Sequence, residues 1–344
     1  MTPRVTQQRI AELAGVSQTT VSLVLNGKLG SARIPEATRQ RVLDVINETT
    51  YVADPAARRL IGHGNNLVGV FTYEHAFPTE TSDFYTPLLT GIESEAERVG
   101  VDLLMFTSAP VIDGHRRILH ERSRLRLADG CLLLGREMDA DELQWLSESG
   151  YPFVSVGRRD VPGIRWVGLD YKTAATALAS RIIETGHRRA LYVHLSLTSE
   201  SSSDRAEGLV GRLRAGDVTV TTAEMADASM SAILDLVNSS HATVLVVEDP
   251  TEAEAIHAAL RAGGIAVPNQ LSMVVLGERS RPQDQAIDFT RLSAPRIKLG
   301  SAAMALLHQA LNGEDDTKDA RPQQELLSCV LVNGSTLAQP PSGR

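Results

Sequence analysis

The chain has 344 residues, 42% of them hydrophobic, which is enough to bury at least two cores. Its opening segment, MTPRVTQQRI, is polar, and no apolar run approaches the roughly 18 residues of a membrane-spanning helix, so we expect a multidomain globular protein that is neither secreted nor membrane-bound. The formal net charge of -8 is uneven, because residues 1–62 carry +3 and leave -11 for the remainder. A basic segment on an acidic body is typical of a protein in which only that segment meets phosphates, although chance fluctuation in a short window is the alternative.

Three short helices are predicted at the N-terminus. Thr6 can cap the first, which ends at Gly15, and Ser17 can cap the second after a tight turn. The third runs from near Pro35 to about Thr49. The side chains expected to fill their shared core are Ile10, Leu13 and Ala14, then Val21, Val24 and Leu25, then Val42, Val45 and Ile46. Two short helices joined by a tight turn form a helix-turn-helix.

The second helix carries a dense row of short polar side chains. Gln18 and Thr19, at its start, are short enough to let the helix enter the major groove and carry donors and acceptors for base edges. An ordinary polar helix face is the alternative. Nearby hydroxyl and amide groups can bind phosphates and fix the register, and these belong to Thr6, Ser17, Thr20, Ser22 and Asn26.

Two segments carry a more specific pattern, RIAELAGVSQTTVSLVLNG (residues 9–27) and TRQRVLDVINETTYVADPAARRLI (residues 38–61). They resemble the headpiece of the LacI/GalR (lactose-repressor) family of bacterial transcription regulators, whose pattern is AGVS–T–VSRVLN followed by TR–RV and Y–PN–AR–L. Leu23 stands where that family usually has a base-reading arginine. It would offer an apolar contact, for instance with a thymine methyl, in place of bidentate hydrogen bonds to guanine.

Residues 53–66, ADPAARRLIGHGNN, predict a short helix followed by a linker, with Asp54 as N-cap and Pro55 at the first helical position. So short a helix is not stable alone in water, so we expect it to fold on DNA. The resemblance implies a hinge helix in which Ala57 lies toward the minor groove, Arg58 binds phosphate and Leu60 wedges between base pairs. Packing of Leu60 on the body is the alternative.

From Leu67 onward, apolar runs alternate with amphipathic segments, which predicts two series of βαβ units and two parallel α/β lobes. The expected strands are residues 67–73, 101–107, 129–135 and 153–157, then 165–169, 190–195, 243–247 and 272–277. The body is similar to the type 1 periplasmic-binding-protein fold of the same family. That resemblance implies an N-lobe of about 67–160 and 293–318 and a C-lobe of about 161–288 and 322–340, with crossings near 158–164, 286–292 and 319–325.

Such lobes bind ligands at the carboxyl ends of their strands, in the cleft between them. The effector contacts implied by the resemblance are Phe84, Tyr85, Arg158, Asp170, Arg205 and Asp249. Aromatic stacking with arginine and aspartate on hydroxyl groups suits a sugar or sugar derivative, although each residue taken singly is more often a surface group. Tyr171 and Glu248 replace asparagines of the family pattern. Arg136, together with Arg158 and Arg205, would also suit a phosphorylated or carboxylated ligand.

Motifs for catalysis or metal binding do not appear in the sequence. There is no P-loop, HExxH or GxSxG, and Cys131 and Cys329 lie in apolar stretches that favour buried reduced thiols in a cytoplasmic protein. We therefore expect no enzyme, no cofactor and no metal. A transport-type sugar-binding protein is the rival interpretation, but it predicts a signal peptide and no helix-turn-helix.

Taken together, the resemblance implies an all-α helix-turn-helix headpiece (residues 1–52) and a hinge helix (53–66), joined to a two-lobed periplasmic-binding-protein-like body (67–344). It implies a homodimeric transcription regulator, expected to be a repressor, that binds a pseudo-palindromic double-stranded operator in the bacterial cytoplasm. An effector between the lobes would disfavour, or in some members favour, the folded hinge, which is allostery between distinct sites.

Overall fold

A computed structural model describes residues 5–25, 34–49, 64–74, 84–112, 115–227, 229–279, 287–313 and 323–341 of the chain. The chain forms two compact units, Met1–Asn65 and Asn66–Arg344. Asn26 and the predicted hinge residues Ala57, Arg58 and Leu60 lie outside the described residues. Within the described ranges, no helix is long and apolar enough to cross a bilayer.

The first unit contains the three predicted helices, α1 (Gln7–Ala14), α2 (Gln18–Leu25) and α3 (Glu36–Glu48). The Thr6 hydroxyl accepts a hydrogen bond from the backbone N–H of Arg9 at 3.3 Å, and the Ser17 hydroxyl accepts one from Thr20 at 3.1 Å. Both hydroxyls thus cap helices as predicted. Gly15 ends α1 in the left-handed region, with φ of 64°, which permits the tight turn into α2.

The core of the first unit differs from the prediction at Leu13. Its buried side chains are Ile10, Ala11, Ala14, Val21, Val24 and Val42, with Leu25, Val45 and Ile46 packed against them. Leu13 is 49% exposed, so its assignment to the core is wrong. Residues 10, 11 and 14 fall on one arc of the helix and residue 13 falls beyond it.

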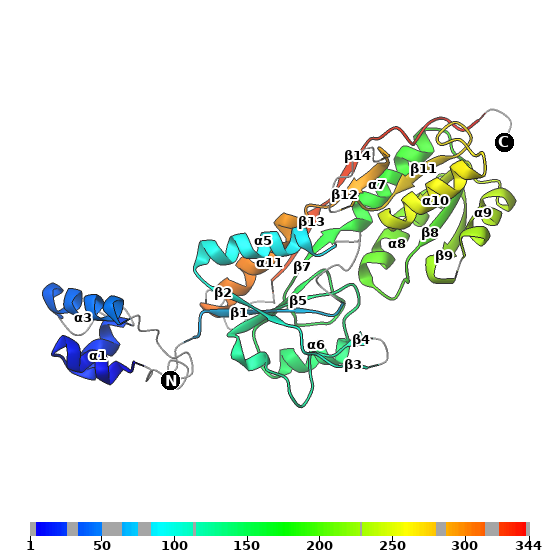
Figure 1. Cartoon of the computed structure of the whole chain (residues 1–344). Helices are drawn as coiled ribbons and strands as arrows, with labels where there is room; N and C mark the ends of the chain where they lie inside the picture. The colour runs from blue at the N-terminus through cyan, green and yellow to red at the C-terminus, as the bar shows by residue number, and fades with distance from the viewer. Residues whose placement is uncertain are drawn as a thin grey trace. The chain divides into compact units, whose positions relative to one another are not determined.

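The second unit contains two six-stranded sheets (Figure 1). The first runs β13-β7-β6-β5-β1-β2 and is parallel throughout. The second runs β14-β12-β11-β10-β8-β9 and is parallel except for β14. The first sheet comprises β1 (Leu67–Thr72), β2 (Asp102–Phe106), β5 (Gly130–Leu134), β6 (Phe153–Val156), β7 (Trp166–Asp170) and β13 (Gln324–Ser328). The second comprises β8 (Arg189–His194), β9 (Thr219–Glu224), β10 (Val244–Val247), β11 (Ser272–Val275), β12 (Thr290–Ser293) and β14 (Val330–Val332).

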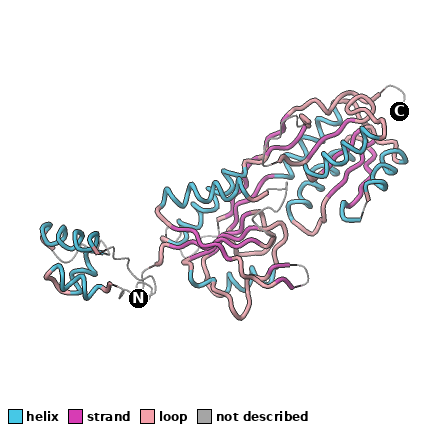
Figure 2. The backbone as a smooth tube through the Cα atoms, in the orientation of Figure 1, coloured by secondary structure: helices cyan, strands magenta, loops and turns pink. Residues whose placement is uncertain are grey.

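Helices cover both sheets, as Figure 2 shows by the helical turns flanking the strands. The helices are α5 (Thr86–Val99), α6 (Ala140–Glu148), α7 (Tyr171–Glu184), α8 (Glu200–Ala215), α9 (Met230–Ser239), α10 (Pro250–Ala262) and α11 (Arg296–Leu311). In the first lobe, α5 and α11 pack on one face of the sheet and α6 on the other. In the second lobe, α7 and α8 cover one face and α9 and α10 the other. The central strands are apolar throughout because both of their faces are buried.

The connection from β2 to β5 contains no α-helix among its described residues. It carries a two-stranded ribbon, β3 (Val111–Ile112) with β4 (His115–Arg116), and a single 3-10 turn, η1 (Leu125–Leu127). Ile118 and Leu125 of this connection help to cover the α6 face of the sheet. The apolar burial that a crossover helix usually supplies therefore comes from a loop.

The predicted boundaries between the lobes are wrong at the first and third crossings, whereas the second lies just beyond the predicted residues 286–292. β7 pairs with β6 and β13, so residues 166–170 and 324–328 belong to the first sheet rather than to the second lobe. The chain crosses at Asp170–Tyr171, between β12 and α11, and at Cys329 between β13 and β14. An apolar run predicts a strand, but long-range pairing decides which sheet receives it. The placement of the helix at residues 295–313 in the first lobe is confirmed by the packing of α11 on α5.

Helices α5 and α11 approach each other closely at two glycines. A β-carbon at Gly91 would lie 1.9 Å from the carbonyl oxygen of Ile297, and one at Gly300 would lie 2.1 Å from that of Leu88. Only glycine permits backbones to come so close. Because Arg296 is the first residue of α11, this contact also sets its distance from the start of α5.

We predict that Gly300→Ala lowers the free energy of unfolding by about 1–3 kcal/mol, because a backbone carbonyl must move to admit the methyl group. Gly211→Ala in α8 is the matched control, since a β-carbon there meets no atom within 4 Å and should add up to about 1 kcal/mol of helix propensity. Urea denaturation of both variants checks the pair. Equal midpoints for Gly300→Ala and the unaltered protein would contradict the close approach.

Candidate functional site

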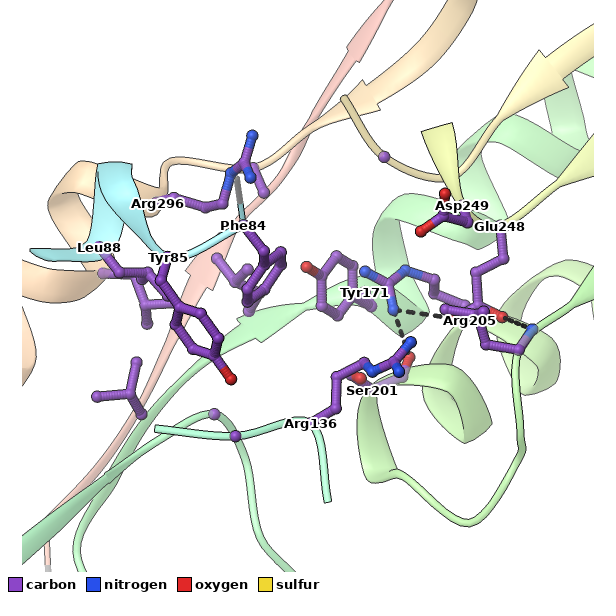
Figure 3. A pocket seen from close by; sticks show the side chains of 18 of the residues that line it. Phe84, Tyr85, Leu88, Arg136, Tyr171, Ser201, Arg205, Glu248, Asp249 and Arg296 are labelled. Carbon is purple, nitrogen blue, oxygen red and sulfur yellow. Dashed lines mark hydrogen bonds and ion pairs between the residues drawn. The ribbon is translucent and has the colours of Figure 1, made fainter. Parts of the chain in front are cut away.

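A cavity of about 380 Å³ lies in the second unit where the carboxyl ends of strands from both sheets meet (Figure 3). Side chains from both lobes line it, including six arginines and five carboxylates. The arginines are Arg136, Arg158, Arg159, Arg205, Arg279 and Arg296, and the acidic residues are Glu74, Asp204, Glu248, Asp249 and Glu278. Parallel strands bring many of these residues together because they follow the ends of strands, whereas Asp204 and Arg205 lie within α8.

Five of the six predicted effector residues line this cavity. They are Phe84, Tyr85, Arg158, Arg205 and Asp249. The sixth, Asp170, is not among the lining residues. Its carboxylate caps α7 by accepting a hydrogen bond from the backbone N–H of Thr173 at 3.0 Å. The carboxylate that was predicted to bind the effector therefore stabilises the start of this helix.

Arg205 is buried at the wall formed by the second lobe. Its guanidinium carbon lies 3.4 Å from the centre of the Tyr171 ring, and its Nη1 donates to Glu248 at 3.2 Å. Burial opposes the charge, but Tyr171 and the Glu248 carboxylate outweigh it and raise the pKa of the guanidinium. Its buried Nε has no acceptor among the described residues. Arg205 is therefore a cation held in place by an aromatic ring and a carboxylate.

Glu248 is the partner that holds Arg205 in place. The carboxylate is 3% exposed and accepts hydrogen bonds from the hydroxyl of Tyr192 at 3.2 Å, the backbone N–H of Leu195 at 3.0 Å and the hydroxyl of Ser202 at 2.5 Å. With the bond from Arg205, both oxygens are occupied. This glutamate, which departs from the family pattern, therefore organises the cavity wall.

Arg158 bridges the two lobes. It donates from Nε and Nη2 to the two carboxylate oxygens of Asp204 in α8, at 2.7 and 2.8 Å, and from Nη1 to Asp160. The hydrogen bond to Asp204 is the main cause of its raised pKa. Arg158 was predicted to bind the effector, but its guanidinium is engaged by carboxylates in this structure.

Two further contacts join the lobes beside Arg158. Arg159 is buried and donates to Glu200 at 2.7 Å. The hydroxyl of Thr198 donates to Glu137 at 2.5 Å. The same side of the cavity is thus bridged by ion pairs and a hydrogen bond, which would have to break for the lobes to separate there.

The first lobe contributes an exposed aromatic face. Phe84 is 46% exposed and packs edge-to-face on Tyr85, with ring centres 5.4 Å apart. The Tyr85 hydroxyl donates to the carboxylate of Glu74, and burial together with that carboxylate raises the pKa of Tyr85. Arg296 lies 5.6 Å from the Phe84 ring. Because Tyr85 is fixed by its hydrogen bond, Phe84 has a set position from which to stack on a ligand.

Within the described ranges, Arg136 lacks the carboxylate partner that the structure shows for four other arginines of the cavity, Arg158, Arg159, Arg205 and Arg279. Its backbone N–H donates to Glu74 at 3.0 Å, while its guanidinium is exposed and has no carboxylate partner among the described residues. It extends into the cavity toward Ser201 and Arg205 (Figure 3). Arg136 is thus a cation available to an anionic or hydroxyl-rich ligand.

Several lining residues were not predicted as contacts, and Glu74, Asp204 and Arg296 are the ones that organise the site. Glu74 directly follows the apolar run of residues 67–73, so its place at the end of an expected strand could have identified it as a cavity residue. Asp204 lies within α8 and Arg296 is the first residue of α11. Only the packing of the two lobes against each other brings these side chains to the cavity. No cluster of three or more histidine, cysteine or acidic side chains in the described part of the chain could hold a metal ion.

The predicted DNA-contacting residues that the structure describes are the N-cap of α1 and the segment from Ser17 to Leu23, which begins α2. Gln18 and Thr19 are exposed, and neither helix has an acidic residue in its first turn to offset its partial positive charge. Thr20 and Ser22 are half-buried, as is Leu23, which replaces the expected arginine. The hydroxyls of Thr6 and Ser17 act as helix caps.

Comparison with known proteins gives two family matches. Residues 6–54 match the family described as bacterial regulatory proteins, lacI family, and residues 75–328 match the periplasmic binding proteins and sugar binding domain of the LacI family. The second match alone covers more than half of the chain. The chain belongs to the LacI family.

Relatives of this LacI-family protein extend over almost its whole length. The HTH-type transcriptional regulator CelR of Thermobifida fusca is 29% identical and covers 90% of this chain and 93% of its own. The lac repressor dimer bound to operator and the anti-inducer ONPF has a TM-score of 0.79 at 19% identity, covering 98% of this chain and 100% of its own. A CelR–cellobiose complex has a TM-score of 0.67 at 24% identity, with 97% and 100% coverage. These structures share the headpiece and the two-lobed fold.

We predict that Arg158 and Asp204 are energetically coupled. In a double-mutant cycle with Arg158→Gln and Asp204→Asn, the coupling in the free energy of unfolding should be about 1–2 kcal/mol, because both groups are mostly removed from solvent and the pair is bidentate. Arg98 and Glu95 in α5 form the control pair. Arg98 is largely solvated, so their coupling should be much smaller. Equal coupling free energies in the two cycles would show that the Arg158–Asp204 pair stabilises the protein no more than an exposed ion pair does.

Proposed function

We propose that this LacI-family protein is a homodimeric transcription regulator, acting as a repressor, that binds a pseudo-palindromic operator under the control of a small ligand in the cavity between its lobes. The observation that carries the proposal is the exposed polar start of α2, where Gln18 and Thr19 can reach base edges in the major groove. Hydroxyls of Thr6, Ser17, Thr20 and Ser22, with Asn26, would hold the phosphates.

The hinge completes the proposed DNA site. We propose that residues 1–52 form the headpiece and that residues 53–66 fold into a helix on the operator. Ala57 and Leu60 would enter the minor groove at the centre of the site, with Arg58 on a phosphate. Leu23 would replace the guanine contact made by the family's arginine with an apolar one, so the operator should differ at that base pair.

The proposed effector is a carbohydrate. Phe84 supplies a face for stacking on a sugar ring. Asp249 caps α10 through Oδ1, and its Oδ2 can accept hydrogen bonds from hydroxyl groups. Arg205 and Arg136, which also line the cavity, extend the choice to phosphorylated or carboxylated sugars. CelR, a relative whose structure is described as a cellobiose complex, supports the sugar class.

Ligand binding would change DNA affinity through the lobes. A ligand that binds one arrangement of the lobes more tightly shifts the population toward it, and the hinge is the element that such a shift would order or melt. The proposal makes the protein a regulator rather than an enzyme. It would act in the bacterial cytoplasm, on the nucleoid while bound to DNA.

The double variant Gln18→Ala/Thr19→Ala should lose preference for the operator while keeping salt-sensitive binding to any duplex. Each base-contacting side chain supplies about 1–3 kcal/mol of discrimination, whereas phosphate contacts are sequence-independent. The operator is first selected from a random-sequence pool with the unaltered protein, and gel-shift titrations then compare it with a scrambled duplex. Gln8→Ala/Gln40→Ala, which truncates exposed polar side chains of α1 and α3, is the control. Unchanged preference in the α2 variant would refute the proposed base contacts.

Variants of the cavity should separate neutral from anionic effectors. Phe84→Ala should weaken binding of any sugar by up to about tenfold, because an aromatic contact of roughly 1 kcal/mol is lost. Arg136→Gln should weaken a sugar phosphate at least as strongly and a neutral sugar much less. Thermal shift and calorimetry with cellobiose and a panel of sugars and sugar phosphates measure both, with exposed Arg261→Gln as control. Unaltered affinity of every binder in both variants would place the effector elsewhere.

A further inference from the structure

An exposed basic loop in the first lobe has no role in the cavity or the headpiece. Arg122, Arg124 and Arg126 alternate along it, and all three are exposed and without a carboxylate partner in the described ranges. Arginines elsewhere in the same lobe, such as Arg98 and Arg117, are paired with carboxylates. Glu121 is the one acidic residue in segment 120–128, so the loop carries a formal charge of +2. It is thus a local positive patch on a unit whose net charge is -11, the difference between -8 for the chain and +3 for residues 1–65.

The backbone of this loop is held in a defined conformation. Leu125 is buried between the arginines, and its carbonyl accepts a hydrogen bond from the Tyr151 hydroxyl at 2.9 Å. The N–H of Leu127 donates to the carbonyl of Arg124 at 2.8 Å and closes η1. Alternation around a buried leucine therefore presents the three guanidinium groups to solvent from a fixed support.

The loop adjoins the point where the second unit begins. Asp129, which follows η1, donates its backbone N–H to the carbonyl of Leu67 at 2.8 Å and accepts the N–H of Leu67 at 3.4 Å. η1 contacts β1 and β5 near their amino ends. The cavity lies at the carboxyl ends of the same strands, so this basic loop is at the opposite edge of the sheet from the ligand.

The connection to the headpiece limits how far this edge can be from bound DNA. Residues 50–65 join α3 to the second unit, and such a segment spans at most about 60 Å when fully extended. A headpiece on its operator therefore keeps the loop at an effective concentration of the order of millimolar relative to the same duplex. At that concentration even weak attraction to phosphates becomes significant.

We propose that Arg122, Arg124 and Arg126 bind phosphates of the double-stranded DNA next to the operator, so that the body adds sequence-independent contacts to those of the headpiece. This inference rests on the proposed function. Duplex DNA presents one negative charge per roughly 1.7 Å of axis, which gives three arginines on one loop several phosphates within reach. The binding surface is then larger than the headpiece and hinge.

The test uses the full-length protein and the operator selected from a random pool, flanked by about 20 further base pairs on each side, which is two helical turns. The variant is Arg122→Gln/Arg124→Gln/Arg126→Gln. The matched control, Arg181→Gln/Arg214→Gln/Arg261→Gln, removes the same charge from exposed positions in α7, α8 and α10 of the second lobe. Fluorescence anisotropy gives Kd from 50 to 200 mM KCl, and thermal unfolding verifies that both variants fold.

The proposed homodimer carries two such loops, so the variant loses up to six phosphate contacts and the slope of log K against log salt should become shallower by up to about 5.4. Affinity should then fall up to roughly 1,800-fold less between 50 and 200 mM KCl than for the unaltered protein, or roughly 40-fold less if the loop of only one protomer reaches the duplex. Preference for operator over scrambled duplex should be unchanged, and the control should keep the original slope. Retained operator preference with equal slopes in all three proteins would overturn this inference alone. If the unaltered protein prefers no sequence at all, the proposed function fails and this inference fails with it.

Discussion

The carboxylate of Glu248 holds together the wall of the cavity that the second lobe supplies. A buried carboxylate is strongly unfavourable unless its oxygens are hydrogen-bonded, so donors from Tyr192, Leu195 and Ser202 must converge on it as the lobe folds. The same oxygens hold the guanidinium of Arg205 against the ring of Tyr171. A ligand would therefore meet a cation that is already oriented and would lose little affinity to its ordering.

Charge in the cavity is mostly balanced before any ligand arrives. Arg158 and Arg159 neutralise carboxylates of the opposite lobe, and Arg279 pairs with Glu254. The bridging arginines thus link ligand recognition to lobe geometry, because a ligand that takes hydrogen bonds from Arg158 competes with Asp204. Arg136, which has no such partner among the described residues, and the half-exposed ring of Phe84 remain as the groups through which the first lobe can discriminate between ligands.

Strand β1 connects the two ends of this arrangement. It begins at Leu67, where the chain enters from the headpiece, and ends just before Glu74 at the cavity, a span of about 20 Å for six residues. Its last five residues are buried and it pairs with β2 and β5, so it is held firmly in the sheet. Movement of the first lobe at its carboxyl edge is therefore transmitted to the amino edge, where the connection to the headpiece and the basic loop lie.

Local chemistry in the sequence was enough to predict the helices of the first unit with their caps at Thr6 and Ser17 and most strands of the body. Those features depend on periodicity, capping and strand ends, which neighbouring residues decide. The six proposed effector residues came from the family resemblance, and five of them line the cavity. The cap at Asp170 is also local, because its partner Thr173 is three residues away, but the family resemblance assigned that carboxylate to the effector. Only the tertiary structure decided that β7 and β13 join the first sheet and that Leu13 lies outside the core. It also decided that Arg158 bridges the lobes and that Glu248 gathers its donors. These depend on pairing between residues far apart in the chain, and the free energy of such contacts is not encoded in any one segment.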